Sequence, residues 1–556
     1  MENCFKQIEA RISGMFDLAV GWSLEDGQMR DPYESVYSEN FSPACWSAVA
    51  AGLYALTHEK KHLEWAGKWS RRSAVMMRES PPLRDYLLGY AAMIFPILQG
   101  RVDPSWLEAI RKKHAGTFAK GKPFCICDEM HIAMLQLIGN VYAPPQGEEG
   151  VLEARESLLR ALEGRVNSMG FLADDRDDGH SIPHMLLTCA SLAIFLLDEG
   201  LDASFRKRIV NVLAKTSMWH GRFNGANHLP AQANRSFNQM YVYPLSALLS
   251  FVGGGKGELE RIGAIFKYQG RFTGKNGFPS ITPNHLSPYA TAGVETNYNR
   301  LDNDLGVGTL AWTLLLLLGK KGWPGIERET WRAVGSVHDN DAGFGVFHQD
   351  KNRVFFALRT HRKWSYHLPL QPLSICFSSQ EQPPFCGAKR SGANNPNLKL
   401  IETPSLLNPL LDPYFGIYAK RKDGRYAVMD GRADALSGGG FKFSGKDMEL
   451  SFDAGLENDS LLLSYDYQTG GYESAFFAVP VLLWDGKDEL NYAIEKNRVR
   501  MDWQGRKYLL EARSSRETWA LAMERSLATG YGVSGHMVIP IKTAGKIELL
   551  LSEVAG

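Results

Sequence analysis

Two groups of polar side chains in the middle of the chain combine amide, imidazole and phenol chemistry. The first is Asn227-His228, preceded by Gly225-Ala226, and the second joins His285 to Tyr289. An amide that donates to a carboxylate disperses the charge that grows there when the neighbouring carbon loses its proton. A phenol or imidazole within hydrogen-bond reach can take that proton and supply an acid to the leaving oxygen. These residue types therefore predict β-elimination from a uronic acid sugar.

The order of these motifs resembles that of the polysaccharide lyases that join a helical toroid to a β-sandwich: the hyaluronate, chondroitin and xanthan lyases, the heparinase II/III type and the toroid alginate lyases. The match is an Asn-His element ahead of a Gly-Phe pair and a His/Tyr cluster. The resemblance implies Asn227 as the neutralising amide and Tyr289 as the proton-transfer group. It also implies His228 and His285 as helpers. Because the next Tyr in the chain is Tyr298, the choice between Tyr289 and Tyr298 stays open.

Further polar side chains near the motifs are candidates for binding an anionic sugar. Arg235 and Asn238 follow the first motif, and Tyr298 and Arg300 precede a predicted helix. An Arg guanidinium can hold a carboxylate or sulfate through two parallel hydrogen bonds. In the C-terminal half, one predicted hairpin is rich in basic and aromatic residues, including His348, Arg353, Arg359 and Trp364. Its similarity to the first strands of the lyase sandwich implies anion binding by Arg or His and stacking of Trp364 on a sugar ring.

The elements that must position these residues change in kind near residue 335. Before it, apolar residues recur at helical spacing in segments separated by polar or Gly/Pro breaks. The predicted helices are Cys45–Leu56, Leu63–Met77, Leu83–Leu98, Met130–Ile138, Val151–Leu162, Met185–Leu197, Phe205–Leu213, Met240–Phe251 and Leu305–Leu318. Stacked helix pairs of this kind form an open solenoid or a closed toroid. The closed toroid is implied by the lyase resemblance and not by the periodicity.

After residue 335, alternating patterns and turn signals such as Asp485-Gly486 replace the helical periodicity. The predicted strands are Phe344–Phe347, Arg353–Arg359, Leu373–Ser378, Phe415–Tyr418, Leu461–Tyr467, Phe476–Leu483, Val499–Trp503 and Ile547–Leu551. Many short strands without intervening helices favour a sandwich. The predicted fold class is therefore α+β with two domains: an N-terminal (α/α) toroid over residues 1–335 and a C-terminal antiparallel β-sandwich over residues 336–556.

Charge and composition limit the partners of the chain. Its 62 Lys and Arg balance 61 Asp and Glu, so no global basic field favours nucleic acid or a membrane surface. The acidic N-terminus is unlike a secretion signal, and the apolar run Leu310–Leu318 is too short for a membrane span. Seven scattered Cys suit a reducing compartment. We therefore expect a cytoplasmic protein that acts on imported uronate oligosaccharides, and the oligomeric state stays open.

Two segments contain residue types that bind metals. The first combines Cys125 and Cys127 with Asp128 and His131. Thiolates and imidazoles are zinc ligands, but the Cys-x-Cys spacing at the start of an apolar helix favours buried structural thiols. The second is the acidic run Asp174–His180, whose oxygens suit calcium. Because this run lies just before a predicted helix, we favour helix capping there and expect neither a metal nor a cofactor.

Two alternatives to a lyase remain. A glycoside hydrolase on the same helical toroid needs two carboxylates flanking the scissile bond, which Asp174–Asp178 with Glu295 or Asp302 would supply. A carbohydrate-binding protein that keeps the fold without turnover is the other. Each motif residue by itself is more often structural, for example an Asn that caps a helix. The combination of Asn, His and Tyr with a large β half favours the lyase.

Overall fold

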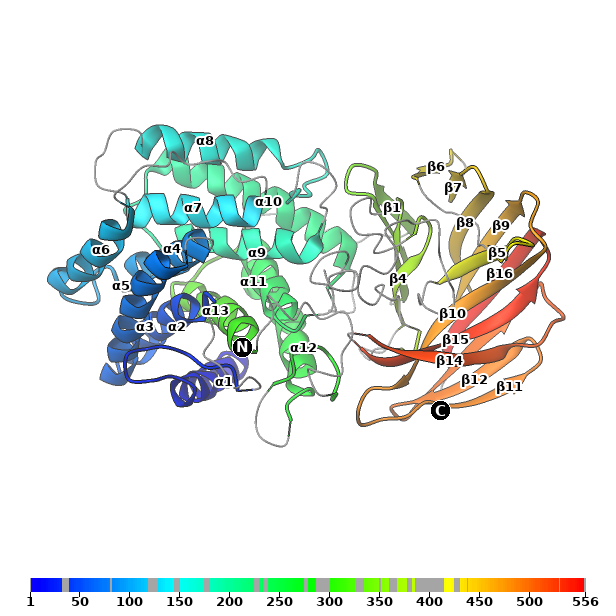
Figure 1. The fold of residues 1–556 in the computed structure, drawn as a ribbon. Helices are drawn as coiled ribbons and strands as arrows, with labels where there is room; N and C mark the ends of the chain where they lie inside the picture. The colour runs from blue at the N-terminus through cyan, green and yellow to red at the C-terminus, as the bar shows by residue number, and fades with distance from the viewer. Residues whose placement is uncertain are drawn as a thin grey trace.

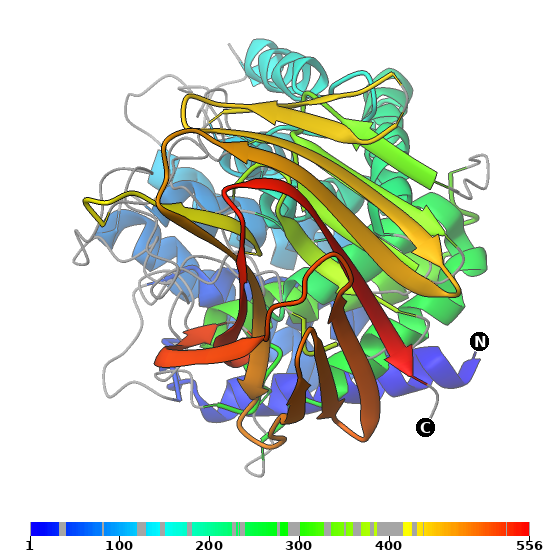
Figure 2. The ribbon, with the colours of Figure 1, turned by 90° about the vertical axis from the view of Figure 1, so that its right-hand side faces the viewer.

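In the computed structural model, helices form the N-terminal half and strands form the C-terminal half (Figure 1). The residues described are 2–32, 40–80, 83–118, 129–144, 151–174, 181–224, 230–231, 233, 239–274, 279–286, 301–326, 335–349, 352–359, 368–377, 383–385, 415–424, 431–437, 439–529 and 531–554. Viewed from the β half, the sheets lie across one end of the helical half (Figure 2).

Within the described residues, six helices form an inner ring: α2 (Ser42–Thr57), α4 (Arg84–Ala92), α7 (Met130–Tyr142), α9 (Ile182–Leu192), α11 (Val242–Gly254) and α13 (Leu301–Lys320). Each packs against the next, and α13 packs against α2, which closes the ring. Helices such as α11 are buried on nearly every face, because ring neighbours and outer helices surround them. By length and hydropathy alone α13 would pass for a membrane span, yet its apolar window is completely buried.

A second set of helices covers the ring from outside: α1 (Glu2–Gly21), α3 (Lys60–Glu79), α6 (Pro104–Phe118), α8 (Val151–Gly164), α10 (Ala203–Asn224) and α12 (Leu259–Gly270). They are amphipathic: α8, for instance, buries Val151, Leu158, Leu159 and Leu162, which recur at helical spacing. Inner and outer helices largely alternate along the chain, so the predicted (α/α) toroid is confirmed. The open solenoid is excluded by the packing of α13 on α2.

The helix bounds differ from the sequence expectations at a few places. The periodicity did not predict α1, α6 or α12. The segment Leu83–Leu98, predicted as one helix, is divided at Met93 into α4 and the short α5 (Ile94–Leu98). Pro96 explains the break, because its nitrogen cannot donate to the carbonyl of Ala92. Short 3-10 turns, η2 (Ala193–Leu196) and η3 (Gly255–Glu258), follow α9 and α11.

The described strands form antiparallel sheets. The largest, in the order β11-β12-β13-β16-β9-β8-β7-β6, contains Asn491–Glu495, Arg498–Trp503, Arg506–Ala512, Ala544–Val554, Ser460–Thr469, Met448–Glu457, Phe441–Ser444 and Ala433–Ala435. The next, β14-β15-β10-β5, contains Ala520–Thr529, Gly532–Ile541, Ser474–Trp484 and Gly416–Lys420. Apolar side chains of both sheets share one core. The predicted sandwich is therefore confirmed.

A third sheet joins the two halves. It consists of β1 (Gly335–Asp339), β2 (Phe344–Gln349), β3 (Asn352–Ala357) and β4 (Pro372–Cys376). In β2, Phe344 and Val346 belong to the helical core, whereas Phe347 belongs to the sandwich core. In β3, Phe355 faces the helices and Val354 faces the sandwich. Because successive side chains point to opposite faces of a strand, this sheet is buried on both sides.

Candidate functional site

The inner helices begin at a common end of the toroid. Asn40, before α2, donates its amide to Asp302 of α13 at 3.2 Å. Phe41 stacks on Tyr86 of α4 with ring centroids 4.8 Å apart. The Tyr86 hydroxyl lies 2.8 Å from Nε2 of His131 in α7. These contacts link neighbouring helix starts, and we call this end the N-terminal end of the ring.

The β half packs against the same end. Asn167, in the turn between α8 and α9, donates to the Asp339 carboxylate of β1 at 2.9 Å, as does the indole N–H of Trp219 in α10. The backbone N–H of His285, before α13, donates to the carbonyl of Asp485 at 2.6 Å. The segments that precede α9 and α13, and the helix α10 that precedes α11, are therefore held by residues of the β half.

Most of the predicted site residues lie outside the described residues: Asn227, His228, Arg235, Asn238, Tyr289, Tyr298, Arg300 and Trp364. The remaining four, His285, His348, Arg353 and Arg359, are described. Two of the four, His348 and Arg353, contact residues that directly precede the Asn227 motif, and His285 directly precedes the Tyr289 segment. The described residues therefore give the framework at both motifs.

The end of α10 is capped by side chains of the shared sheet. Arg353 of β3 donates through Nη1 to the carbonyls of Phe223, at 3.4 Å, and Asn224. The Nε2 atom of His348 in β2 donates to the carbonyl of Arg222 at 2.9 Å. The last carbonyls of a helix lack intrahelical donors and carry partial negative charge, so cations and donors are favoured there. The β half thus anchors the helix end that leads into Asn227.

Burial sets the charge state of one of these donors. Burial, and then the positive charge of Arg353, lower the pKa of His348 to about 4. At neutral pH the ring is therefore neutral and has one N–H, which the short contact to the Arg222 carbonyl assigns to Nε2. The capping contact is consequently made by a neutral imidazole beside a charged guanidinium.

The side chain of Asn224 links the two flanks of the Asn227 segment. Its Oδ1 accepts from the backbone N–H of Ala231, and its Nδ2 donates to Nε2 of His220. The same His220 nitrogen lies 2.8 Å from the hydroxyl of Ser246 in α11. Because Asn224 is only 2% exposed, this network is a buried connection between α10, the Ala231 backbone and α11.

These positions bear on the roles expected for the hairpin residues. Arg353 is 1% exposed, and its Nη2 also contacts Ser374 and Cys376. A guanidinium directed at buried carbonyls does not direct those donors at a substrate, so these contacts favour a positioning role for Arg353 over the expected anion contact. The same holds for His348, which is 7% exposed. Arg359 is half-buried, with its side chain over Gly343 in the β1–β2 turn.

The second anchor is a backbone contact at His285. Gly486 has a φ of +97°, and a Cβ placed there would lie 2.5 Å from the His285 carbonyl carbon and 2.7 Å from Leu286 N. Only glycine permits this approach, because any side chain would strike backbone. Asp485 shapes the turn, since its carboxylate accepts the N–H groups of Lys487 and Asp488.

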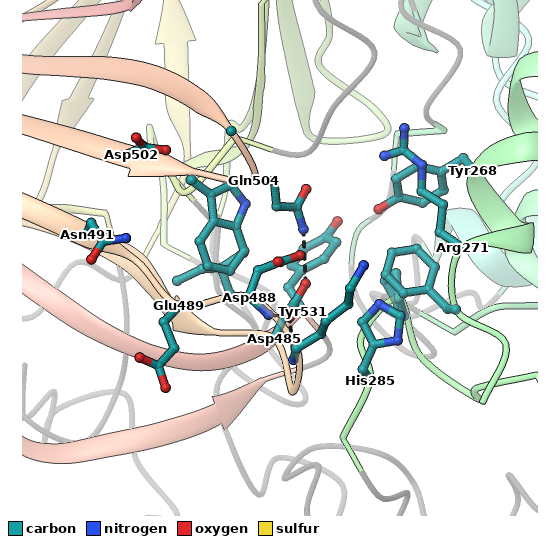
Figure 3. Close-up of a pocket in the computed structure, with 16 residues that line it drawn as sticks. Tyr268, Arg271, His285, Asp485, Asp488, Glu489, Asn491, Asp502, Gln504 and Tyr531 are labelled. Atoms are coloured by element: carbon teal, nitrogen blue, oxygen red, sulfur yellow. Dashed lines mark hydrogen bonds between the residues drawn. The ribbon is translucent and has the colours of Figure 1, made fainter. Parts of the chain in front are cut away.

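A cavity of about 810 Å³ opens beside this anchor, between α12 and the β half (Figure 3). Tyr268, Arg271 and His285 line its helical wall, whereas the opposite wall contains Asp485, Asp488, Glu489, Asp502 and Gln504. Four carboxylates face this space, against the cations Arg271 and Lys487. Such a lining repels an anionic sugar, so the electrostatics disfavour this cavity as a uronate site.

The described carboxylates that a hydrolase would use are buried. Asp302 is 0% exposed and accepts from Asn40. Asp174 is 4% exposed and lies within hydrogen-bond distance of His131 and His184. Burial alone would raise the pKa of the Asp174 carboxyl, but the two imidazoles outweigh it and hold that pKa well below its usual value. A carboxyl whose pKa is lowered in this way does not resemble an acid poised to donate a proton to a glycosidic oxygen, so Asp174 does not fit that role.

The acidic run Asp174–His180 was expected to cap the helix that follows it. For Asp174, the one described residue of the run, this expectation is wrong. The residue that caps α9 is Ser181, whose hydroxyl accepts from the N–H of His184 at 3.3 Å. Asp174 instead accepts the backbone N–H of His131 at the start of α7, at 3.1 Å. The rest of the run, 175–180, lies outside the described residues, as do Cys125, Cys127 and Asp128.

Sequence reasoning missed several residues that hold this framework, notably Asn224, Asp339 and Gly486. Partial signals existed for the last two. Asp485-Gly486 was predicted as a turn, and Asp339 opens a polar segment between two apolar stretches. The sequence did not indicate which residues these turns contact, because their partners, such as His285 and Asn167, are far away in the chain.

No known family model and no curated protein matches this sequence. Its fold is similar to that of heparinase III, with a TM-score of 0.53 and 9% identity, over 96% of this chain and 80% of that one. A chondroitin AC lyase from Streptomyces coelicolor A3 in complex with chondroitin sulphate has a TM-score of 0.46 and 8% identity, over 100% of this chain and 79% of that one. A glycosyl hydrolase of family 88 from Bacteroides vulgatus has a TM-score of 0.39 and 11% identity, over 56% of this chain and 97% of that one. The first likeness spans both halves and agrees with the toroid-plus-sandwich architecture.

Proposed function

We propose that this chain is a lyase that cleaves a uronate-containing poly- or oligosaccharide by β-elimination. One observation carries the proposal: the β half anchors the described residues next to both motifs, Asn224 before Asn227 and His285 before Tyr289. The fold likeness to heparinase III supports it. Because one fold hosts several chemistries, the Asn, His and Tyr residue set provides the chemical argument.

In the proposed reaction the Asn227 amide donates to the uronate carboxylate and stabilises the charge that develops on it. Tyr289 or Tyr298 removes the proton from the carbon beside that carboxylate. The glycosidic oxygen leaves from the next carbon and takes a proton from the same Tyr or from a neighbouring His. A double bond forms between the two carbons, and no water is consumed.

Substrate binding is assigned to the remaining polar residues. Arg235, Asn238 and Arg300 are proposed to hold the carboxylate or a sulfate, and Trp364 to stack on a sugar ring. Arg359 stays a candidate for charge at the hairpin. Arg353 and His348 are assigned to positioning, because their donors are directed at the carbonyls that end α10.

Ultraviolet absorbance separates this function from its alternatives. We expect the purified protein to generate the conjugated-alkene chromophore from at least one member of a panel of uronate polymers and oligosaccharides. A hydrolase acting on unsaturated uronyl sugars would instead remove the chromophore from lyase-digested oligosaccharides. A binding protein would do neither, while still retaining glycan in equilibrium dialysis, and either of these results would contradict the proposal.

Replacing the proposed neutralising amide tests the chemistry directly. We expect Asn227→Ala to lower turnover by about two to three orders of magnitude, which is the usual loss for one oxyanion donor. Thermal unfolding should be unchanged. A variant that unfolds normally and turns over at the wild-type rate would remove Asn227 from the mechanism.

The two candidate Tyr residues can be distinguished by deleting one hydroxyl at a time. Tyr289→Phe keeps the ring, so kcat should collapse while affinity for substrate is largely retained. Tyr298→Phe serves as the matched variant and should affect binding more than kcat. If only Tyr298→Phe abolishes turnover, proton transfer belongs to Tyr298.

A further inference from the structure

Three buried side chains from separate segments meet at the N-terminal end of the ring. His131 lies in the first turn of α7, Asp174 follows the turn after α8, and His184 lies in the first turn of α9. The Nδ1 atom of His131 is 2.9 Å from Oδ1 of Asp174, and the Nδ1 atom of His184 is 2.7 Å from Oδ2. One donor atom from each residue lies within 4.8 Å of the others.

The three groups form a ligand set of defined chemistry. Two imidazole nitrogens and a carboxylate oxygen are the protein ligands found in many zinc sites. The carboxylate accepts the backbone N–H of His131 at the start of α7, which favours its ionised, ligating form whichever imidazole nitrogens carry the protons. All three side chains are buried: His131 and Asp174 are each 4% exposed, and His184 is 6% exposed. A buried carboxylate favours a compensating cation.

The outer contacts of His131 match those of a metal ligand. Its second nitrogen, Nε2, lies 2.8 Å from the Tyr86 hydroxyl and 3.4 Å from a Glu129 carboxylate oxygen. A histidine that binds a metal through one nitrogen usually donates its other N–H to such a group, which fixes the tautomer and orients the ring. Tyr86 and Glu129 would hold the tautomer with the proton on Nε2, and Nδ1 would then be free to bind a cation.

We propose that His131, Asp174 and His184 bind a divalent transition-metal ion, with Zn²⁺ the best match. In the bound state each imidazole has its proton on Nε2, and a water or another ligand completes the tetrahedral coordination. The site joins α7 to α9. The site also fixes Asp174, which ends the segment after α8, and Asn167 of the same segment contacts Asp339 of the β half. Metal binding would therefore stabilise the toroid end that faces the shared sheet, independently of the lyase proposal.

The test uses the full chain after treatment with a chelator. We expect isothermal titration with ZnCl₂ to show one high-affinity site, and the midpoint of thermal unfolding to rise when Zn²⁺ is added. Co²⁺ should give the visible absorption of tetrahedral coordination. Asp174→Asn and His184→Gln should each weaken Zn²⁺ binding by at least about 100-fold, and Tyr86→Phe by about 10-fold, as for an outer contact.

Two controls separate this site from adventitious binding. His62 is also buried, at 1% exposure, but its ring contacts the Thr57 hydroxyl, so His62→Gln should leave Zn²⁺ affinity unchanged. A Cys125→Ser, Cys127→Ser double variant should also bind normally. His184→Gln keeps the proposal testable if Asp174→Asn does not fold. Absence of stoichiometric Zn²⁺ binding, or affinity that depends on the Cys pair and not on His184, would overturn the proposal and leave the cluster a hydrogen-bonded network.

Discussion

The two motif segments are anchored to the β half in different ways. Before Asn227, the anchor consists of side-chain donors, because Arg353 and His348 cap the carbonyls at the end of α10. Before Tyr289, the anchor is backbone, because the His285 N–H meets the Asp485 carbonyl and Gly486 permits the close approach. The first anchor therefore depends on side-chain hydrogen-bond donors and their charge, and the second depends on close packing of two backbone segments. Substitutions and pH should affect the two differently.

The largest effect is expected from removing the charged donor. Arg353→Met keeps the aliphatic stem but leaves the carbonyls of Phe223 and Asn224 without that donor. We expect the free energy of unfolding to fall by about 3 kcal/mol, since a hydrogen bond to a charged group contributes about 1.5 to 3 kcal/mol. Turnover should fall as well if the Asn227 motif depends on this anchor. Urea unfolding and the ultraviolet assay measure the two effects.

Arg498→Met is the matched control for that substitution. Arg498 lies in the sandwich and pairs at 3.0 Å with Glu511, with its own side chain 52% exposed. Exposed ion pairs contribute about 0 to 1 kcal/mol, so this variant should unfold almost as the wild type does. Equal stability of the two variants would show that the capping of α10 by Arg353 is energetically unimportant.

A smaller and more local effect is expected at the backbone anchor. Gly486→Ala places a Cβ against the backbone of His285, so the turn and the segment before Tyr289 must separate. Gly471→Ala is the control, because Gly471 has a positive φ of +70° and nothing within 4 Å of the added Cβ. Both variants carry the strain of a left-handed residue, about 1 to 2 kcal/mol. Only Gly486→Ala should also lower kcat. Equal kcat values for the two variants would show that this turn does not influence the site.

The smallest effect at neutral pH is expected at His348. Its pKa is lowered to about 4 in the fold, against 6.5 as its ordinary value, so the folded state binds fewer protons than the unfolded chain between these values. The stabilisation is present above pH 6.5 and is lost as pH falls towards about 4. His348→Gln keeps an N–H donor without a titrating group, and should flatten this acid-induced loss by at most about 3 kcal/mol. Unfolding midpoints across that range measure it, and identical curves for both proteins would refute the assignment.

Local patterns in the sequence predicted most of the elements. The apolar run of α13 and the periodicity of α11 follow from residues within one helix, and the strands β9 and β10 follow from alternation within one strand. The turn at Asp485-Gly486 was also readable, because Asp and Gly favour turns by their own chemistry. Tests of Asn227, Tyr289 and Tyr298 remain tests of sequence-based predictions, since these residues lie outside the described ranges.

Only the tertiary structure decided how these elements meet. Closure of the ring by α13 on α2, the double burial of the β2–β3 sheet, and the direction of Arg353 towards α10 all join residues far apart in the chain. The meeting of His131, Asp174 and His184 is of the same kind. The sequence grouped His131 with Cys125 and Cys127 and grouped Asp174 with the acidic run, and it gave no signal for His184. Periodicity reports which face of an element is apolar, whereas a site depends on which polar faces are brought together, and that is set by packing between elements.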